Sequence, residues 1–278
     1  MESLPCPLCG NSNTKHLFNK QDIAFNTCLK CRFIFSRPAI NPNLANTLQD
    51  FEPAYLGYLK PQHHDKKNHD ELIRKLGMIK DVGSSRILDI GCGSGKFIRY
   101  LRSKGYNAFG LEPSTALFNE FLKDDYFFFN EDVRTFINRD APKIFDIIIV
   151  SDVLEHVAEP HPFMSAVLKL LARKGVLFIS TPDTSSFFAQ MLGKRWHYYN
   201  KYHLSLYSRK NLNELTARYG LRHVVSGYLS RYQSLNYLFQ YGLNFIFHSP
   251  RTLPEHFKNI NLPINLRDNM YSIHLNEG

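Results

Sequence analysis

Short apolar runs alternate with amphipathic segments over most of the chain. Between about Asp65 and Lys80 the apolar residues recur at helical spacing, which predicts a helix before the main alternation begins. Strands are predicted beyond it at residues 86–90, 107–111, 127–129, 145–150 and 175–180. The helices predicted between them run over 94–104, from Ser114, and near 162–172. Strands that alternate with helices of this length indicate βαβ units and a parallel sheet buried on both faces.

The C-terminal part continues the pattern with one helix and two more strands. Ser208 is a suitable N-cap, and the helix that it opens is expected to end at Gly220, whose missing Cβ suits a left-handed turn. Strands are predicted at 223–230 and 268–275. Between them residues 232–247 are apolar and aromatic, which fits either a core helix or a helix that covers a substrate.

The first part of the chain differs in composition from the rest. Residues 1–40 are rich in Cys, Asn and Pro without a helical period, so we expect a small module there, followed by a linker over 41–65. The remaining residues, 66–278, are expected to form the main α/β domain.

Composition restricts the possible classes of protein only slightly. A chain of 278 residues, 44% of them hydrophobic and 21% charged, fits one or two globular domains with a sizeable core. The formal net charge of +9 favours anionic partners. The N-terminus shows no secretory signal, and no apolar run reaches the roughly 18 to 20 residues of a membrane span, so a cytoplasmic protein is expected.

Four of the five cysteines form two CxxC pairs separated by 18 residues. These are Cys6, Cys9, Cys28 and Cys31. Four thiolates at this spacing match a tetrahedral structural Zn²⁺ site, and so short a segment has too little core to fold without one. The alternative is four free or redox-active thiols. With sulfur in all four positions the zinc would be structural, in a zinc-ribbon-like module.

The segment from Ile87 to Phe97 is the most informative in the chain. Its three glycines follow a strand and precede a helix, so the backbone can approach a ligand at the carboxyl edge of the sheet. The GxGxG spacing departs from the GxGxxG of dinucleotide sites. Asp89 opens the loop, and Glu112 ends the next strand 23 residues later, where a carboxylate can accept both ribose hydroxyls. An acid at the start of such a loop suits a cationic ligand, which points to a sulfonium or an amino acid.

At this point the sequence resembles the class I S-adenosylmethionine-dependent methyltransferases over roughly residues 70–275. The resemblance rests on the loop from Asp89 to Gly95, on Glu112, on the acids after the third strand, on Phe145-Asp146 and on the segment 175–182. It implies a seven-stranded Rossmann-like sheet whose last strand is antiparallel. It also implies acceptor-binding or lid segments at 183–207 and 231–265.

The resemblance further implies a set of residues around S-adenosylmethionine. Asp89, Gly91 and Gly93 would hold the methionine end, Glu112 the ribose, and Asp132 and Val133 the adenine. Ser151 and Asp152 would line the face where the methyl group is transferred. The complete expected set is Asp89, Gly91, Cys92, Gly93, Gly95, Phe97, Glu112, Pro113, Asp132, Val133, Ser151 and Asp152.

Methyl transfer to a hydroxyl requires that the acceptor, the methyl group and the sulfur be aligned. It often also requires a base or a metal, which is expected near the end of the fourth strand. Asp152, Glu155 and His156 lie there within five residues, and His203 follows in an aromatic stretch. The set resembles that of small-RNA 2′-O-methyltransferases and ubiquinone-biosynthesis O-methyltransferases, where such residues hold a divalent cation. Asp152 stands where those members carry Glu. The alternatives are that His156 or His203 acts as a base or orients the acceptor, or that the histidines are structural.

The expected acceptor is a small, anionic or sugar-linked molecule. Residues 191–231 hold eight Lys and Arg and one Glu among several tyrosines, which suits phosphate, although such a run is also typical of a solvated surface. A zinc module joined to a class I domain resembles bacterial methyltransferases of sugar and cell-surface polysaccharide biosynthesis. We therefore expect methyl transfer to a hydroxyl of a sugar or nucleotide-linked sugar. The alternatives are an RNA 2′-O-methyltransferase, a quinone-type O-methyltransferase, and a non-catalytic S-adenosylmethionine-binding protein.

Overall fold

The computed structural model describes residues 4–20, 22–37, 59–60, 62, 65–139, 144–234 and 261–278. The expected linker at 41–65, the apolar segment 232–247 and the lid segment 231–265 fall largely outside these residues. Where 232–247 is described, residues 232–234 belong to a short strand, β11 (Arg231–Ser234), that pairs with β12 (Asn261–Ile264).

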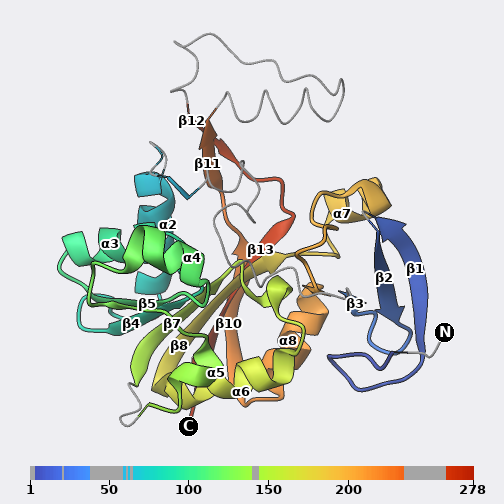
Figure 1. Ribbon diagram of the computed structural model, residues 1–278, viewed down its shortest axis with the longest axis horizontal. Helices are drawn as coiled ribbons and strands as arrows, with labels where there is room; N and C mark the ends of the chain where they lie inside the picture. The colour runs from blue at the N-terminus through green and yellow to red at the C-terminus, as the bar shows by residue number, and fades with distance from the viewer. Residues whose placement is uncertain are drawn as a thin grey trace.

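A seven-stranded sheet forms the centre of the molecule (Figure 1). Its strands are β4 (Arg86–Ile90), β5 (Asn107–Leu111), β6 (Phe128–Phe129), β7 (Phe145–Ser151), β8 (Leu171–Pro182), β10 (Leu221–Tyr228) and β13 (Asn269–Asn276). They lie in the order β10-β13-β8-β7-β4-β5-β6. Only β13 runs against its neighbours, since it pairs antiparallel with both β8 and β10. The expected sheet with an antiparallel last strand is confirmed.

Helices cover both faces of this sheet. On one side lie α2 (Asp65–Gly77), α3 (Lys96–Ser103) and α4 (Thr115–Leu117), which continues as a π-helical turn, Phe118–Leu122. On the other lie α5 (Val133–Phe136), α6 (Pro160–Leu170) and α8 (Arg209–Ala217) (Figure 1). The remaining helical segments are α7 (Phe187–Leu192) and the 3₁₀ turns Leu154–His156 and Gly193–Arg195.

The central strands alternate their side chains between these two helical layers. In β7, Ile148 packs with the α5–α6–α8 layer, whereas Ile147 and Ile149 pack with the α2–α3 layer. All three are fully buried, and each contributes roughly 1.5–3 kcal/mol by leaving water. The continuous apolar run that predicted a doubly covered strand is thus explained.

Local chemistry accounts for several element boundaries. The Ser208 hydroxyl accepts from the N–H of Asn211, whose side chain in turn bonds back to Ser208, so α8 begins with a reciprocal cap as expected. The helix predicted from residue 94 begins at Lys96 because Gly95 has a left-handed backbone (φ 72°). Strand β8 begins at Leu171, earlier than predicted, because Leu171 already pairs with Phe145.

The N-terminal module forms a second sheet that incorporates a strand from the main domain. β1 (Thr14–Lys20), β2 (Ile23–Cys28) and β3 (Ile34–Ser36) are antiparallel neighbours, and β3 pairs with β9 (Ser205–Leu206). In Figure 1 the blue module lies beside the segment that leads from α7 to α8. The module is therefore joined to the main domain by backbone hydrogen bonds as well as by packing.

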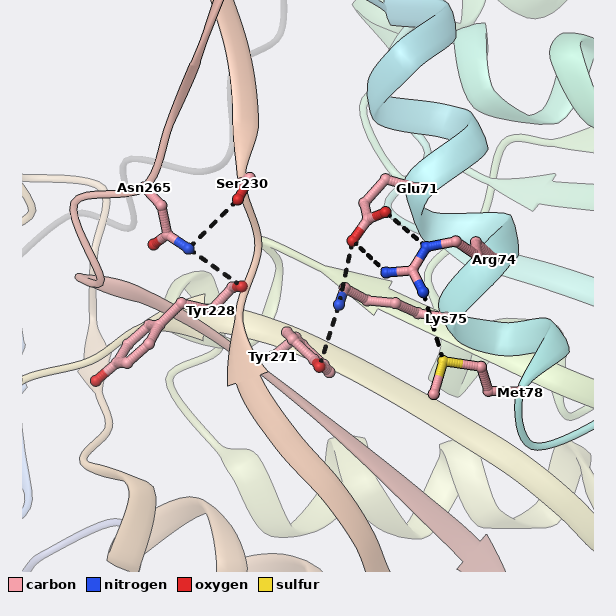
Figure 2. Close-up of polar contacts among 8 residues, drawn as sticks. All are labelled: Glu71, Arg74, Lys75, Met78, Tyr228, Ser230, Asn265 and Tyr271. Atoms are coloured by element: carbon pink, nitrogen blue, oxygen red, sulfur yellow. Dashed lines mark hydrogen bonds and ion pairs between the residues drawn. The ribbon is translucent and has the colours of Figure 1, made fainter.

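Helix α2 is tied to the sheet by one lysine (Figure 2). The Lys75 ammonium lies 3.2 Å from a Glu71 carboxylate oxygen and donates to the Tyr271 hydroxyl at 3.3 Å. Arg74 binds the same carboxylate through two hydrogen bonds of 2.9 Å. In the part of the chain that is described, no helix is both long and apolar enough to cross a bilayer.

Candidate functional site

The glycine loop between β4 and α3 stands at the carboxyl end of the sheet. Gly91 has φ 74°, and a Cβ there would lie 2.6 Å from a Val153 methyl, so both the backbone and the space require glycine. Gly93 also has a positive φ of 57°, but a Cβ there would meet only Leu59 at 3.4 Å. The two glycines therefore have different roles. Gly91 allows Val153 to pack against the loop, whereas Gly93 allows the turn and leaves open space beside it.

The loop is held by the end of the neighbouring strand. The backbone N–H groups of Gly91 and Cys92 both donate to the Leu111 carbonyl, at 2.8 and 2.9 Å. The Glu112 carboxylate accepts from the Gly93 N–H at 2.9 Å and from the Ser114 N–H at 2.9 Å. Glu112 thus connects the tip of the loop to the turn after β5.

Two carboxyl groups make the base of the loop acidic. Asp89 is 7% exposed and Glu112 is 6% exposed. Burial, with a further contribution from the nearby Glu112 charge, raises the pKa of Asp89 to about 8. Burial also raises the pKa of Glu112 to about 7, although its two backbone donors act in the opposite direction. A cation bound here would relieve this cost of burying negative charge.

A cavity of about 470 Å³ opens at the carboxyl ends of β4 and β7. The predicted residues that line it from the loop side are Asp89, Gly91, Cys92, Gly93 and Phe97. Those that line it from the end of β7 and beyond are Ser151, Asp152, Glu155, His156 and His203. The structure therefore brings the residues expected to hold the methionine end of the cofactor and the expected catalytic residues around one space.

The remaining expected cofactor residues are not part of this cavity wall. Gly95 forms the N-cap of α3, and Glu112 and Pro113 follow β5. Asp132 caps α5, where its carboxylate accepts from the N–H groups of Arg134 and Thr135 at 2.7 and 3.1 Å. Val133 is the first residue of that helix and is 2% exposed. The adenine role of Asp132 and Val133 stays a prediction.

Two of the residues drawn in Figure 2 line the cavity on another side. Glu71 reaches it from α2, and Ser230 reaches it from beyond the end of β10. The Asn265 amide nitrogen lies 3.5 Å from both the Tyr228 carbonyl and the Ser230 hydroxyl. The cavity is thus bounded by residues from both ends of the main domain.

The two histidines of the predicted cluster lie against each other. The rings of His156 and His203 are edge to face, with centroids 4.9 Å apart. His156 Nδ1 lies 3.0 Å from the Tyr202 carbonyl, and His203 Nδ1 lies 2.7 Å from the Tyr198 carbonyl. A carbonyl can only accept, so each Nδ1 carries the hydrogen and each neutral ring has its lone pair on Nε2. Burial lowers the pKa of His156, and it lowers that of His203 to about 3, which keeps both rings neutral.

Glu155 completes a three-residue cluster. It is 2% exposed, and its Oε2 accepts from the Thr181 hydroxyl at 2.9 Å. One ligand atom each of Glu155, His156 and His203 lies within 4.8 Å of the other two. In metal sites the ligating imidazoles and carboxylates are usually oriented by hydrogen bonds to neighbouring groups. The three side chains here are oriented in that way, so this set of donor atoms fits a divalent cation.

Asp152 lies outside this group of three. It adopts a left-handed backbone (φ 54°), which is uncommon for a residue other than glycine. Its N–H donates to the Ser180 carbonyl at 2.9 Å, and its Oδ1 accepts from the Asn269 amide at 2.8 Å. Such strain at the edge of a cavity is typical of residues that a site holds in place.

The four predicted zinc ligands converge in the N-terminal module. The sulfur atoms of Cys6, Cys9, Cys28 and Cys31 lie within 4.8 Å of one another. The Cys6–Cys31 and Cys9–Cys28 distances are 3.7 and 3.5 Å, near the about 3.8 Å edge of a tetrahedron with Zn–S bonds of about 2.3 Å.

The two CxxC turns share one geometry. The residues after them, Gly10 and Arg32, both have positive φ (72° and 62°). Each N–H donates to the carbonyl of the first cysteine of its pair, at 2.9 Å. The four cysteines therefore fit a structural zinc ion.

Three residues that line the site or orient its side chains were not predicted from the sequence. Tyr198 and Asn269 line the cavity, and Thr181 orients Glu155. Asn269 comes from β13 and Thr181 from β8, so their approach to the cluster depends on strand pairing that no local motif encodes. Tyr198 was visible only as one aromatic in a basic segment.

Comparisons with known proteins agree on one chemistry. The family model described as "Methyltransferase domain" matches residues 62–226. Among curated relatives, the "Ubiquinone biosynthesis O-methyltransferase" of Bartonella quintana is 30% identical over 138 residues, 48% of this chain and 54% of that protein. The protein of the same name from Rickettsia conorii is 28% identical over 107 residues, 37% of each chain. The chain spans about half or less of the length of these two relatives.

Solved structures share the fold at low sequence identity. A SAM-dependent methyltransferase from Archaeoglobus fulgidus matches with a TM-score of 0.56 and 17% identity, over 81% of this chain and 100% of that one. The 1,6-didemethyltoxoflavin-N1-methyltransferase of Burkholderia thailandensis matches with a TM-score of 0.52 and 12% identity, over 95% of this chain and 100% of that one. These likenesses support the fold alone.

Proposed function

Since this chain belongs to the methyltransferase-domain family, we propose that it is an S-adenosylmethionine-dependent methyltransferase that methylates a hydroxyl oxygen of a small molecule. The observation that carries the proposal is the shared cavity. The glycine loop with Asp89 lines one side, and the Glu155–His156–His203 cluster lines the other. The relatives described as O-methyltransferases support oxygen as the acceptor atom.

The cofactor is proposed to lie along the loop. When bound, S-adenosylmethionine supplies a methyl group on a positively charged sulfur. Asp89 would face the cationic methionine end, and the open space beside Gly93 would admit it. Each Glu112 oxygen already accepts one backbone N–H, and a carboxylate oxygen has a second lone pair with which to accept a ribose hydroxyl.

The cluster is proposed to receive the acceptor hydroxyl. Neutral His156 and His203 each present an Nε2 lone pair, which can take a proton from a hydroxyl within hydrogen-bond reach. Burial keeps both rings neutral at physiological pH, so that Nε2 can accept a hydrogen bond, but it also makes each ring a weaker base than an exposed histidine. Asp152, fixed by Asn269, would hold the acceptor oxygen in line with the methyl group.

A divalent cation at Glu155, His156 and His203 is the second part of the proposal. The support is the convergence of three ligand atoms, each on a side chain that a further hydrogen bond orients. Such an ion supplies positive charge that favours the deprotonated form of a nearby hydroxyl. The same residues would then be ligands, and Asp152 would orient the acceptor.

Two acceptor classes fit a site of this kind. A sugar or nucleotide-linked sugar would use the basic residues of the 191–231 segment, whereas a quinol would follow the names of the two relatives. Neither these relatives nor the two solved structures are described as acting on a sugar. We propose an acceptor that carries a hydroxyl group able to reach the cluster, a feature that both classes share.

Transfer of label from methyl-labelled S-adenosylmethionine tests the function. The purified chain is incubated with a cell extract that is then separated into RNA, protein, lipid-soluble quinols and small anionic metabolites. Label in either small-molecule pool, resistant to mild alkali as an ether is, supports the proposal and identifies the class. Nuclease-sensitive label in RNA would overturn it. Binding of S-adenosylhomocysteine with no label in any pool would instead indicate a non-catalytic binding protein.

Dialysis against EDTA tests the cation, with zinc content followed in the same samples. Activity that falls while zinc stays bound, and returns with Mg²⁺ or Mn²⁺, supports the cation. Full activity after removal of all metal except zinc would exclude it and leave the histidines as the base. The Glu155→Gln variant should have lost the response to added Mg²⁺.

A further inference from the structure

Among the described residues, the segment Trp196–Tyr207 connects the four-cysteine module to the reaction site. Lys20 donates to the Trp196 carbonyl at 2.8 Å, and the rings of Phe18 and Phe25 lie 5.0 and 5.3 Å from that of Tyr199. Further along, β3 pairs with β9, so that Ile34 lies opposite Leu206. The module therefore supports this segment along its whole length.

The opposite side of the same segment builds the cavity. Tyr198 and His203 line it directly. The Tyr202 carbonyl orients His156, and the Ser205 hydroxyl donates to the Val157 carbonyl at 2.7 Å. Residues 196–207 thus lie between the module and the cluster.

Ser36, the last residue of β3, connects the two through its backbone and its side chain. Its N–H donates to the Leu204 carbonyl at 3.0 Å, and its hydroxyl donates to the His203 carbonyl at 3.1 Å. The Leu204 N–H then donates to the Glu155 carbonyl at 2.8 Å. The His203–Leu204 peptide unit is therefore bonded to the module through its carbonyl and to the backbone of Glu155 through its N–H.

The cysteine site sets the position of β3. Cys28 ends β2, Cys31 precedes β3 by three residues, and the Cys31 carbonyl accepts from the Asn211 amide at 2.8 Å. Ser36 is 2% exposed, so its hydrogen bonds have no competition from water. A shift of the CxxC turn would be transmitted over five residues to the backbone of His203.

We propose that the four-cysteine module is a positioning element of the reaction site. A metal ion at Cys6, Cys9, Cys28 and Cys31 fixes β3, and β3, through Ser36, fixes His203 and Glu155 at the cavity. Ser36 is a positioning residue, because it acts through the backbone of His203 and does not line the cavity. This role rests on the proposed function only in taking the cluster as the acceptor side of the site.

The test uses the full chain with ¹³C-labelled histidine, whose ring resonances report the surroundings of His156 and His203. Ser36→Ala removes one hydroxyl and leaves the cysteines untouched. We expect it to shift or broaden both ring resonances while the Kd for S-adenosylhomocysteine, measured by calorimetry, changes by less than about twofold. Ser36→Thr, which keeps the hydroxyl, should restore the wild-type ring resonances.

A matched control is available in α3. The Ser103 hydroxyl also donates to a backbone carbonyl, that of Tyr100 at 2.8 Å, but it is distant from the module, so Ser103→Ala should alter neither readout. Removal of zinc by a strong chelator should move the same two resonances as Ser36→Ala.

Unchanged ring resonances in both Ser36→Ala and the zinc-free chain would overturn the positioning role. The readouts need no acceptor, so failure of the hydroxyl-methylation proposal would leave this result intact, and the reverse also holds. If the zinc-free chain unfolds, Ser36→Ala alone decides, because it keeps the zinc site.

Discussion

The backbone N–H of Gly93 donates to the Glu112 carboxylate at 2.9 Å, which joins the tip of the loop after β4 to the acid that directly follows β5. Glu112 is therefore both an expected ribose ligand and a support for the loop. Any change at Gly93 acts on the shape of the loop and on the acid that faces it.

The first prediction concerns Gly93→Val. The left-handed backbone at Gly93 costs a β-branched residue about 1–2 kcal/mol, and the new side chain would occupy the cavity. We expect affinity for S-adenosylhomocysteine to fall at least about 100-fold, roughly 2.7 kcal/mol, while thermal unfolding stays a single transition. Gly105→Val is the matched control, since Gly105 also has a positive φ (85°) but faces open space outside the cavity wall. Equal binding by the two variants would contradict the placement of the cofactor.

The second prediction is that cofactor binding releases protons near pH 7. The pKa values of Asp89 and Glu112 are raised to about 8 and about 7, so both are partly protonated in the ligand-free protein. A bound ammonium group favours their charged forms and lowers both pKa values. Calorimetry with S-adenosylhomocysteine in phosphate and in Tris should show a difference in binding enthalpy, and Asp89→Asn should reduce it. Identical enthalpies in the two buffers would count against the assignment.

The third prediction concerns stability without ligand. In the unfolded chain Asp89 loses its proton near its ordinary pKa of 3.8, whereas in the folded chain it keeps it to about 8. The unfolded state therefore binds fewer protons between these values, and the contribution of Asp89 to stability falls as the pH rises from about 4 to about 8. The free energy of unfolding, measured with urea at several pH values, should change differently for wild type and for Asp89→Asn across this window. The variant should be less sensitive to pH. Parallel curves would show that Asp89 is not held protonated.

The fourth prediction is that the purified chain contains one zinc ion bound by four cysteines. Cys28→Ala should lose the zinc and lower the melting temperature, because a tetrahedral site with three thiolates binds more weakly. Cys92→Ala should keep it, since Cys92 lies in the glycine loop. Elemental analysis by emission spectroscopy decides. Zinc retained in full by Cys28→Ala would refute the site.

The fifth prediction separates chemistry from binding. His203→Gln should lower the rate of methyl transfer by about 10²–10⁴, as loss of a positioned base or ligand does, with S-adenosylhomocysteine affinity within about twofold of wild type. His16→Gln is the control, because His16 lies exposed on β1. A His203 variant with normal turnover would show that the histidine is structural.

Much of this architecture follows from residues that act locally. The buried run of β7, the positive φ of the loop glycines and the cap at Ser208 each show in a short stretch of sequence, and each was predicted, although the packing of Val153 against Gly91 was not. The four cysteines were also found from spacing alone, and the structure brings their sulfur atoms together.

The parts that could not be predicted depend on distant segments. The pairing of β3 with β9 joins residues about 170 positions apart, and β9 is only Ser205–Leu206, too short to leave a pattern. Asn269 reaches Asp152 only because β13 lies beside β8. The sequence therefore indicated that His156 and His203 could meet, but not which backbone groups would orient their rings.

The place of β13 determines what the sheet would lose without this strand. β13 follows β8 and β10 in the sequence, yet in the sheet it lies between them, and β10 pairs with it through seven residues between Leu221 and Tyr228. Until β13 pairs with it, β8 presents an open, apolar edge. A variant that lacks residues 269–276 would therefore lose an interior strand of the sheet and leave the facing edges of β8 and β10 unpaired.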